Sequence, residues 1–268
     1  MTMSDVLTEA PYVLRDFNGG VLTLTLNRAG KFNPLSEEML TELQTALDQA
    51  KADANVRIIV LAAAGRAFCA GHDLKQMRAS PSEDYYRKLF NQCSKLMLTI
   101  QQLPQPVIAR VQGIATAAGC QLVSMCDLAV ASTEAMFAVS GVNYGLFCST
   151  PAVGLSRNIP RKQAMEMLLT GDFIDAETAL ERGLVNRVAA PEALDAEIAK
   201  LTASILAKPA TAVAMGKQLF YKQLEMGIGA AYQLAGQTMA CNMMDDSALE
   251  GVQAFIEKRA PAWKAQQQ

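Results

Sequence analysis

The sequence is poor in the residues that build metal sites and disulfide frameworks. Its 268 residues include one histidine, His72, and six cysteines with no CxxC pair. This set offers too few ligands, too widely spaced, for a structural metal. We therefore predict no metal site, interpret the cysteines as reduced thiols that mostly pack like small core residues, and expect a cytoplasmic protein.

The sequence also lacks an excess of one charge and long apolar runs. Its 24 basic and 26 acidic residues give a net charge of −2, with no basic run to neutralise a phosphate backbone. No apolar run reaches the roughly 18 to 20 residues that would span a bilayer. The start, MTMSDVLTEAPYV, has acids where a signal peptide needs a basic region. We expect no nucleic-acid partner, no membrane partner and no targeting segment.

The chain does contain an alternation of apolar strands with helices. With 51% hydrophobic residues it can bury a large core. Ser36, followed by Glu37 and Glu38, is typical of a helix start, and Pro81-Ser82 indicates a second one. Strand patterns occupy residues 21–28, 57–65, 105–113 and 128–132. This spacing predicts an α/β crossover fold with buried strands.

The character of the chain changes near its last third. Beyond about Pro191 the strand patterns stop, and the stretch to Trp263 has the pattern of successive helices. We therefore divide the chain into an α/β core, residues 1–195, and a helical region, residues 196–268. A helical extension of this kind commonly provides a contact between subunits.

Two short turns place very small residues between an apolar strand and a helix. They are residues 69–72, Cys-Ala-Gly-His, and residues 117–119, Ala-Ala-Gly. Helix N-termini carry unpaired N–H groups and a partial positive charge, and small side chains let a ligand approach them. Two such N–H groups on one oxygen would form an oxyanion hole. The alternative is that glycine and alanine here only allow a helix and a strand to pack closely.

Four segments resemble the crotonase family, also called the enoyl-CoA hydratase/isomerase family. The resemblance is collinear and runs from about Val21 to Trp263. It implies a spiral of ββα units with a helical C-terminal trimerisation region, assembled as a homotrimer or a dimer of trimers. The segments are AFCAGHDLKQM (67–77), VQGIATAAGCQLVSMCDLAVAS (111–132), LLTGDFIDAETALERGLVNRV (168–188) and EGVQAFIEKRAPAW (250–263).

The same resemblance implies an acyl-CoA thioester substrate whose carbonyl oxygen lies between two backbone N–H groups. On this sequence the two donors are the amides of His72 and Ala118. Coenzyme A is part of the substrate, so we predict no separate cofactor. Further positions match contacts to CoA in the family: Ala70 for the adenine, Lys31 for the phosphates, and Phe255 and Lys258 for the CoA of a neighbouring subunit.

The sequence departs from the family pattern at both acid–base residues. Family hydratases hold water between two glutamates, and the matching positions here are Gln121 and Gly141. Gly141 is placed by the phrase F-x-x-P-E-x-x-x-G, framed by Phe137 and Gly145. Each lost acid–base group commonly costs about 10² to 10⁴-fold in rate. The protein is then nominally an enoyl-CoA hydratase/isomerase-family lyase of fatty-acid or related metabolism, in which ordinary hydratase activity is in doubt.

Several alternatives stay open at this level. The His72 ring could act as an acid or base, bond nearby backbone, or have no role beyond its amide. Asp73 is better interpreted as a helix-start residue than as a base. A family decarboxylase shares the GHD turn, but its tyrosine falls at about Cys148, whereas the nearest tyrosine here is Tyr144. A relative that binds acyl-CoA without turnover is a further alternative.

Overall fold

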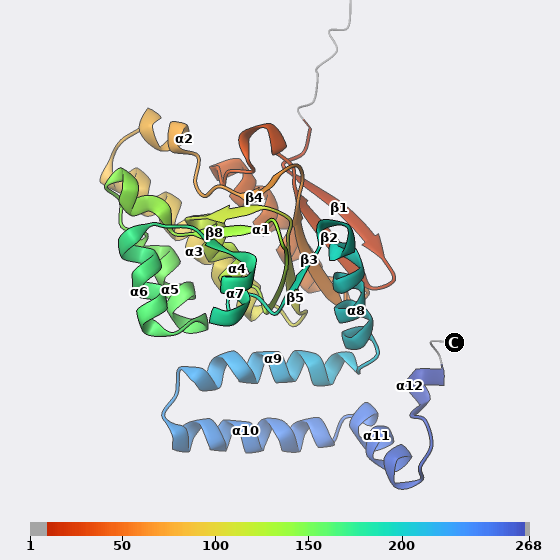
Figure 1. Ribbon diagram of the computed structural model, residues 1–268. Coiled ribbons are helices and arrows are strands. Elements are labelled where there is room, and N and C mark those ends of the chain that lie inside the picture. The colour runs from red at the N-terminus through yellow and green to blue at the C-terminus, as the bar shows by residue number, and fades with distance from the viewer. Residues whose placement is uncertain (1–9, 266–268) are drawn as a thin grey trace, which may run out of the picture.

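The computed structural model describes residues 10–265, which form two β-sheets covered by helices (Figure 1). The expectation that the chain starts without a targeting segment falls mainly on residues 1–9, outside the described residues. The larger sheet has the spatial order β1 (Val13–Asn18), β2 (Val21–Leu26), β3 (Ile58–Ala63), β5 (Val107–Val111), β7 (Leu128–Ser132) and β10 (Arg187–Ala189). The smaller sheet has the order β4 (Ala67–Cys69), β6 (Ile114–Thr116), β8 (Met136–Ala138) and β9 (Ile174–Asp175).

Consecutive strands are shared between the two sheets in a repeating manner. In each of the pairs β3–β4, β5–β6 and β7–β8, the first strand joins the larger sheet and the second joins the smaller, and a helix follows. Strands β2, β3, β5, β7 and β10 are parallel. All six residues of β3 are buried, which explains the unbroken apolar run seen in the sequence. The predicted α/β spiral of ββα units is confirmed.

Helices α1 to α7 belong to the α/β core and pack around the sheets. Ser36 and Ser82 cap α1 and α3 by accepting from Met39 N at 3.3 Å and from Tyr85 N at 3.2 Å, as the sequence predicts. The short helix α2 was not predicted as a separate element, although Asp73 is its N-cap. The helices are α1 (Glu37–Ala52), α2 (Leu74–Ala79), α3 (Glu83–Gln102), α4 (Ala118–Met125), α5 (Ser149–Asn158), α6 (Arg161–Thr170) and α7 (Ala176–Arg182).

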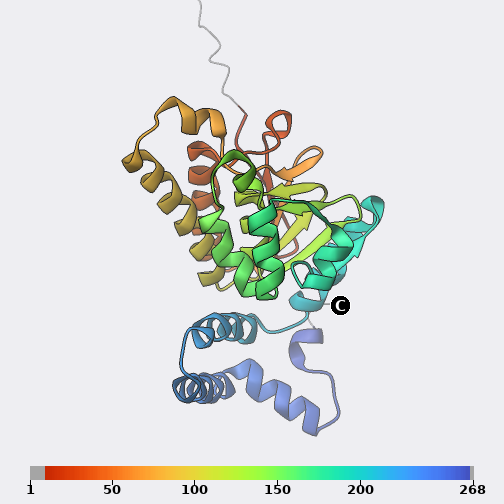
Figure 2. The same cartoon turned by 60° about the vertical axis from the view of Figure 1, so that its left-hand side comes forward.

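The predicted helical region is present at the C-terminal end and leads away from the sheets (Figures 1 and 2). Its first helix, α8, packs Leu194 and Ile198 against the larger sheet, and the predicted start of the region at residue 196 falls inside this helix. Helices α9 and α10 have no buried residue. The bounds are α8 (Leu194–Leu206), α9 (Ala210–Leu224), α10 (Ile228–Met243), α11 (Asp246–Ile256) and α12 (Ala262–Ala265); we call α9 to α12 the helical arm.

One bent pair of helices among the described residues resembles a membrane-spanning segment in length and composition only. Within residues 10–265, no single helix is long and apolar enough to cross a membrane. The helices over 191–206 and 210–224 together have the length and apolar composition of a membrane span, and the chain bends by 103° between them.

A buried ion pair fastens the helical arm to the core. The Lys217 ammonium on α9 donates to Asp127 Oδ2 at 2.6 Å and to the carbonyl oxygens of Ile100 and Gln105, both at 2.8 Å. Tyr221 donates its hydroxyl to the other oxygen of Asp127 at 2.8 Å. All three ammonium hydrogens have acceptors, which is the condition under which a buried charge is tolerated. This contact fixes α9 against the loop that leads into β5.

Candidate active site

The two small-residue turns meet in the folded chain. A Cβ atom at Gly119 would lie 2.1 Å from the carbonyl oxygen of Cys69, so the start of α4 rests directly on the end of β4. A Cβ atom at Gly71 would lie 3.0 Å from Ala117 Cβ and 3.4 Å from Ala118 N. Gly71 has a φ of 92°, where a side chain is disfavoured. Glycine is therefore required at both positions for the backbones to approach each other.

Ala117, which precedes α4, has an unusual backbone conformation. Its φ of 50° and ψ of −119° lie in a region that costs a non-glycine residue about 1–3 kcal/mol. The surrounding structure holds it there: Ala117 N donates to Ala138 O at 3.0 Å, and Gln121 N donates to Ala117 O at 3.1 Å. The strained turn therefore lies directly before the first amide of α4, that of Ala118.

The amides of His72 and Ala118 are available to a ligand. Ala118 is the first residue of α4, so its N–H has no acceptor within the helix. Across residues 10–265, neither amide donates to another backbone group of the protein. The close approach of Gly71 to Ala118 N brings these two free donors to one place. Both residues line the same cavity.

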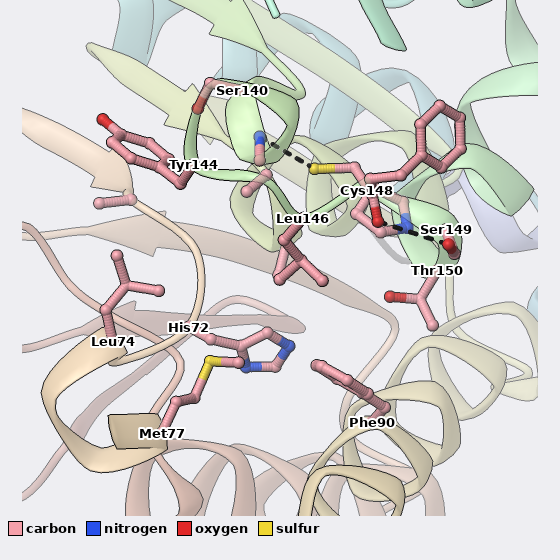
Figure 3. A pocket seen from close by; sticks show the side chains of 16 residues that line it. His72, Leu74, Met77, Phe90, Ser140, Tyr144, Leu146, Cys148, Ser149 and Thr150 are labelled. Atoms are coloured by element: carbon pink, nitrogen blue, oxygen red, sulfur yellow. Dashed lines mark hydrogen bonds between the residues drawn. The ribbon is translucent and has the colours of Figure 1, made fainter. Parts of the chain in front are cut away.

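The cavity has a volume of about 300 Å³ and is mostly apolar (Figure 3). One side is formed by Ala70, His72, Ala117 and Ala118, and we call it the turn wall. The opposite side is the segment of residues 140–151 that runs from the end of β8 into α5, and we call it the loop wall. Between them lie Leu74 and Met77 of α2 and Phe90 of α3. No carboxylate is among the described residues that line the cavity.

The imidazole of His72 points into the space between Met77, Leu146 and Phe90 (Figure 3). Its Nδ1 lies 3.1 Å from the carbonyl oxygen of Leu35. Because a carbonyl oxygen only accepts, Nδ1 carries the proton of the neutral ring and Nε2 has the free lone pair. Nε2 is buried and has no hydrogen-bond partner among the described residues. Burial lowers the pKa of His72 below its usual range, against a smaller raising effect of the Leu35 contact.

The loop wall is held by weaker contacts. Gly141 N donates to Cys148 Sγ at 3.3 Å, and Ser140 Oγ and Thr116 Oγ1 lie 2.8 Å apart. Burial raises the pKa of the Cys148 thiol, which argues against a reactive thiolate. Tyr144 is 78% exposed at the rim, and neither its hydroxyl nor Cys148 has a hydrogen bond to His72 in the described residues. Cys148 and His72 therefore do not form a hydrogen-bonded pair of nucleophile and base among the described residues.

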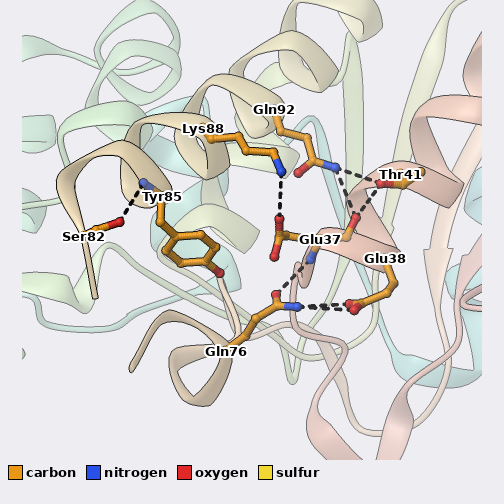
Figure 4. Close-up of polar contacts among 8 residues, drawn as sticks. All are labelled: Glu37, Glu38, Thr41, Gln76, Ser82, Tyr85, Lys88 and Gln92. Carbon is orange, nitrogen blue, oxygen red and sulfur yellow. Dashed lines mark hydrogen bonds and ion pairs between the residues drawn. The ribbon is translucent and has the colours of Figure 1, made fainter. Parts of the chain in front are cut away.

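Helix α2 is fixed over the cavity by polar contacts with α1 (Figure 4) and by the Tyr86 hydroxyl of α3, which donates to Met77 O at 3.1 Å. Gln76 accepts from Glu37 N at 3.0 Å and donates to the carboxylate of Glu38 at 3.3 Å. Asp73 caps the helix by accepting from Lys75 N at 2.9 Å and Gln76 N at 3.1 Å. These contacts hold the helix that presents Leu74 and Met77 to the cavity. The interpretation of Asp73 as a helix-start residue is confirmed.

The structure brings together some of the predicted site residues and separates others. Ala70, His72, Ala118 and Gly141 all line the cavity. Gln121 does not line it: this residue is buried one turn into α4, and its side-chain oxygen has no partner among the described residues. A carboxylate introduced at position 121 would therefore need a different side-chain direction to reach the cavity.

The three predicted CoA contacts outside the turn wall lie away from the cavity. Lys31 is exposed in the 3₁₀ turn Ala29–Lys31, and Phe255 is 84% exposed at the end of α11, followed by the exposed Lys258. None of them lines the cavity of a single chain. Sequence reasoning missed other residues that do. Leu74, Phe90, Leu146, Phe147 and Thr150 line it, and their apolar or small polar character gave no signal that distinguishes a cavity wall from a core.

Known proteins that are similar to this chain share one family description. A family model described as enoyl-CoA hydratase/isomerase matches residues 16–266. Enoyl-CoA hydratase domain-containing protein 3, mitochondrial, from Xenopus laevis is 43% identical over 97% of this chain and 88% of that protein. The human protein of the same name is 43% identical over 91% of this chain and 80% of that protein. A crystal structure of enoyl-CoA hydratase from Mycobacterium smegmatis has 63% identity and a TM-score of 0.94, over 95% of this chain and 100% of that one.

These names correct one expectation. The prediction of a cytoplasmic protein is wrong on this comparison, because both vertebrate relatives are named as mitochondrial. The prediction relied on the free thiols, and all six cysteines are indeed unpaired, five of them buried. Reduced thiols argue only against an oxidising environment and do not tell one reducing compartment from another.

Proposed function

The chain belongs to the enoyl-CoA hydratase/isomerase family, and from that premise we propose that it binds an acyl-CoA thioester and stabilises its enolate between the amides of His72 and Ala118. The observation that carries the proposal is the pair of free amides, brought together by Gly71 and Gly119 at the wall of an apolar cavity. The chemistry needs no cofactor beyond the coenzyme A that the substrate contains.

The physical case depends on where negative charge develops. When a proton leaves the α-carbon of a thioester, charge moves onto the carbonyl oxygen. Backbone donors fixed at that oxygen need no reorganisation, and each typically contributes about 3–4 kcal/mol to the transition state. The Ala118 donor gains further from its place at the start of α4, where the helix dipole is positive. Neither donor can be titrated away by a change of pH.

Contacts to the rest of the CoA molecule form the second part of the proposal. The backbone of Ala70 borders the cavity beside His72 and would contact the adenine, with Lys31 near the phosphates. Phe255 and Lys258 would approach CoA from a neighbouring subunit of a homotrimer or a dimer of trimers. Support comes from the helical arm, which exposes large apolar side chains. Helices α9 and α10, which have no buried residue, expose Phe220, Leu224, Ile228, Tyr232 and Met239, and α11 exposes Phe255.

The experiment compares binding of two ligands by calorimetry. One is acetyl-CoA, and the other is its thioether analogue, in which a CH₂ group replaces the carbonyl. Two hydrogen bonds to the carbonyl oxygen should make acetyl-CoA bind about tenfold more tightly, at about 0.5–1.5 kcal/mol for each bond. Equal affinities would contradict the oxyanion hole, and no binding of either ligand would contradict an acyl-CoA site altogether.

A second candidate function is binding of acyl-CoA without turnover. The absence of any carboxylate among the described cavity residues favours it over water addition between two glutamates. Tight binding of crotonyl-CoA with neither hydration nor exchange of its protons would identify this case. For the decarboxylase alternative, His72 lies in the cavity as that reaction would need. Tyr144 is exposed at the rim, where it would contact only the outer part of a ligand.

A further inference from the structure

The cavity contains one nitrogen that the fold leaves without a partner. His72 lines the cavity, and its Nε2 is buried and makes no hydrogen bond within residues 10–265. The opposite nitrogen, Nδ1, is fixed by Leu35 O, and the ring lies against Phe90 with centroids 5.6 Å apart. A buried polar atom without a partner is costly, so a ring held in this orientation indicates a ligand that supplies the missing hydrogen.

Every other group that lines the cavity is a poorer base. The sulfur of Cys148 accepts a hydrogen bond from the Gly141 amide, and burial raises the pKa of the Cys148 thiol. Ser140, Ser149 and Thr150 have hydroxyl groups that do not titrate near neutrality, and Tyr144 is largely in solvent. Asp73, next in the chain to His72, already accepts two amides of α2. His72 is therefore the one neutral base among the described residues that line the cavity.

We propose that the imidazole of His72 is the proton acceptor of this site and takes the α-proton of the bound thioester through Nε2. The proposal rests on the function proposed above. The α-carbon–hydrogen bond breaks, an Nε2–H bond forms, and the electron pair of the broken bond moves to the carbonyl oxygen as the thioester becomes an enolate. The imidazolium then returns the proton to the α-carbon, or to the γ-carbon when the acyl chain is a 3-enoyl group. Atoms and electrons balance without a co-reactant.

One residue thus supplies both halves of the site. The backbone amide of His72 faces the carbonyl oxygen, and its ring reaches the carbon beside that oxygen. The ring lies beside Met77, Phe90 and Leu146, none of which carries a charge, and Cys148 and Tyr144 of the loop wall line other parts of the cavity (Figure 3). No charged group among the described cavity residues faces the ring to stabilise an imidazolium, so the protonated form persists only while the enolate is present. The cavity therefore favours transfer of a proton within the substrate over its release to water.

The test measures exchange of the α-protons of butyryl-CoA in D₂O by proton NMR. His72→Asn removes the base but keeps the backbone amide and offers an N–H to Leu35 O at the place of Nδ1. We expect exchange to fall at least about 100-fold in this variant, while calorimetric affinity for butyryl-CoA stays within about threefold. His72→Gln, which offers an N–H at the place of Nε2, serves as a second variant and should be equally inactive.

The pH dependence gives an independent readout. Wild-type exchange should decline as pH falls through the pKa of His72, which burial lowers below 6.5, and residual exchange in His72→Asn should lack that step. Unchanged exchange in a His72→Asn protein that binds butyryl-CoA would overturn the role of the ring and leave the acyl-CoA site intact. Absence of exchange in a wild-type protein that binds the thioester would also overturn it. Failure of the wild type to bind any thioester would overturn the proposed function itself.

Discussion

The turn wall and the loop wall face each other across one cavity but are built in different ways. The turn wall consists of backbone approaches so close that Gly119 has no space for a single carbon atom. The loop wall consists of side chains, several of them exposed, which include Tyr144, Leu146 and Phe147. The contrast separates two tasks. A rigid backbone can place a hydrogen bond on an atom that every thioester shares, whereas exposed side chains can vary with the acyl group.

The largest effect should come from filling the turn wall. Gly119→Ala places a methyl group 2.1 Å from Cys69 O, a backbone atom that cannot move alone. We expect a loss of about 3 kcal/mol or more in the free energy of unfolding, measured with urea, and loss of the tighter binding of acetyl-CoA over its thioether. The matched control is Gly216→Ala on α9, where nothing lies within 4 Å and the free energy of unfolding should rise by about 0.5–1 kcal/mol. Equal effects of the two substitutions would contradict the close approach.

The same substitution in the loop wall should cost less. Gly141→Ala meets Leu146 O at 2.4 Å and Cys148 Sγ at 2.8 Å, but both belong to a segment that can shift outward. We expect a loss of about 1–2 kcal/mol in the free energy of unfolding and an unchanged ratio of thioester to thioether affinity. If that ratio collapsed as in Gly119→Ala, the two walls would not be independent. The crowding also means that glutamate cannot be restored at position 141 without moving the loop.

The buried His72 side chain of the turn wall should also make the free energy of unfolding depend on pH. The pKa of His72 is lower in the folded chain than its ordinary value of 6.5, because the ring is buried. As pH falls below about 6.5 the unfolded chain takes up this proton first, so stability decreases until the folded pKa is passed. The slope is at most about 1.4 kcal/mol for each pH unit. The free energy of unfolding, measured with urea at pH 7.5, 6.5 and 5.5, should show this decrease in the wild type and not in His72→Asn.

The smallest effect should come from the rim of the loop wall. Tyr144→Phe removes a hydroxyl from a side chain that is 78% exposed, so the free energy of unfolding should change by less than about 0.5 kcal/mol. Affinity for butyryl-CoA, measured by calorimetry, should change less than about threefold. A tenfold loss would show that the hydroxyl touches the ligand and that the rim contributes to recognition as well as to shape.

The sequence predicted the local features of this molecule better than its long-range contacts. Ser36, Ser82 and Asp73 cap helices as expected, since capping depends on a few neighbouring residues. The second strands of the ββα units have three residues, too few to show an alternating pattern, and only the family resemblance implied them. The strand β1 was not predicted, because five of its six residues are exposed and give it no buried face to read.

The candidate site shows the same division. Both small-residue turns were found, because glycine and alanine between a strand and a helix are visible locally. Their contact joins residues 71 and 118, and it follows from the parallel pairing of β4 with β6 in the smaller sheet, between strands more than 40 residues apart in the chain. Phe90 falls at a helical position that any core residue of α3 could occupy. The apolar pattern of α3 therefore does not predict its contact with the His72 ring. The free lone pair of Nε2 likewise depends on Leu35, which lies 37 residues earlier in the chain.

The buried ion pair between Lys217 and Asp127 bears on how the attachment of the helical arm should respond to ionic strength. The Lys217 side chain is 6% exposed and that of Asp127 14%, so mobile ions have little access to the pair. The ion pairs of the arm's outer face, such as Arg259 with Glu250, are far more open to solvent. Concentrated salt would therefore screen the exposed ion pairs of the arm while the Lys217–Asp127 pair still held α9 on the core, so the attachment of the arm should be insensitive to ionic strength.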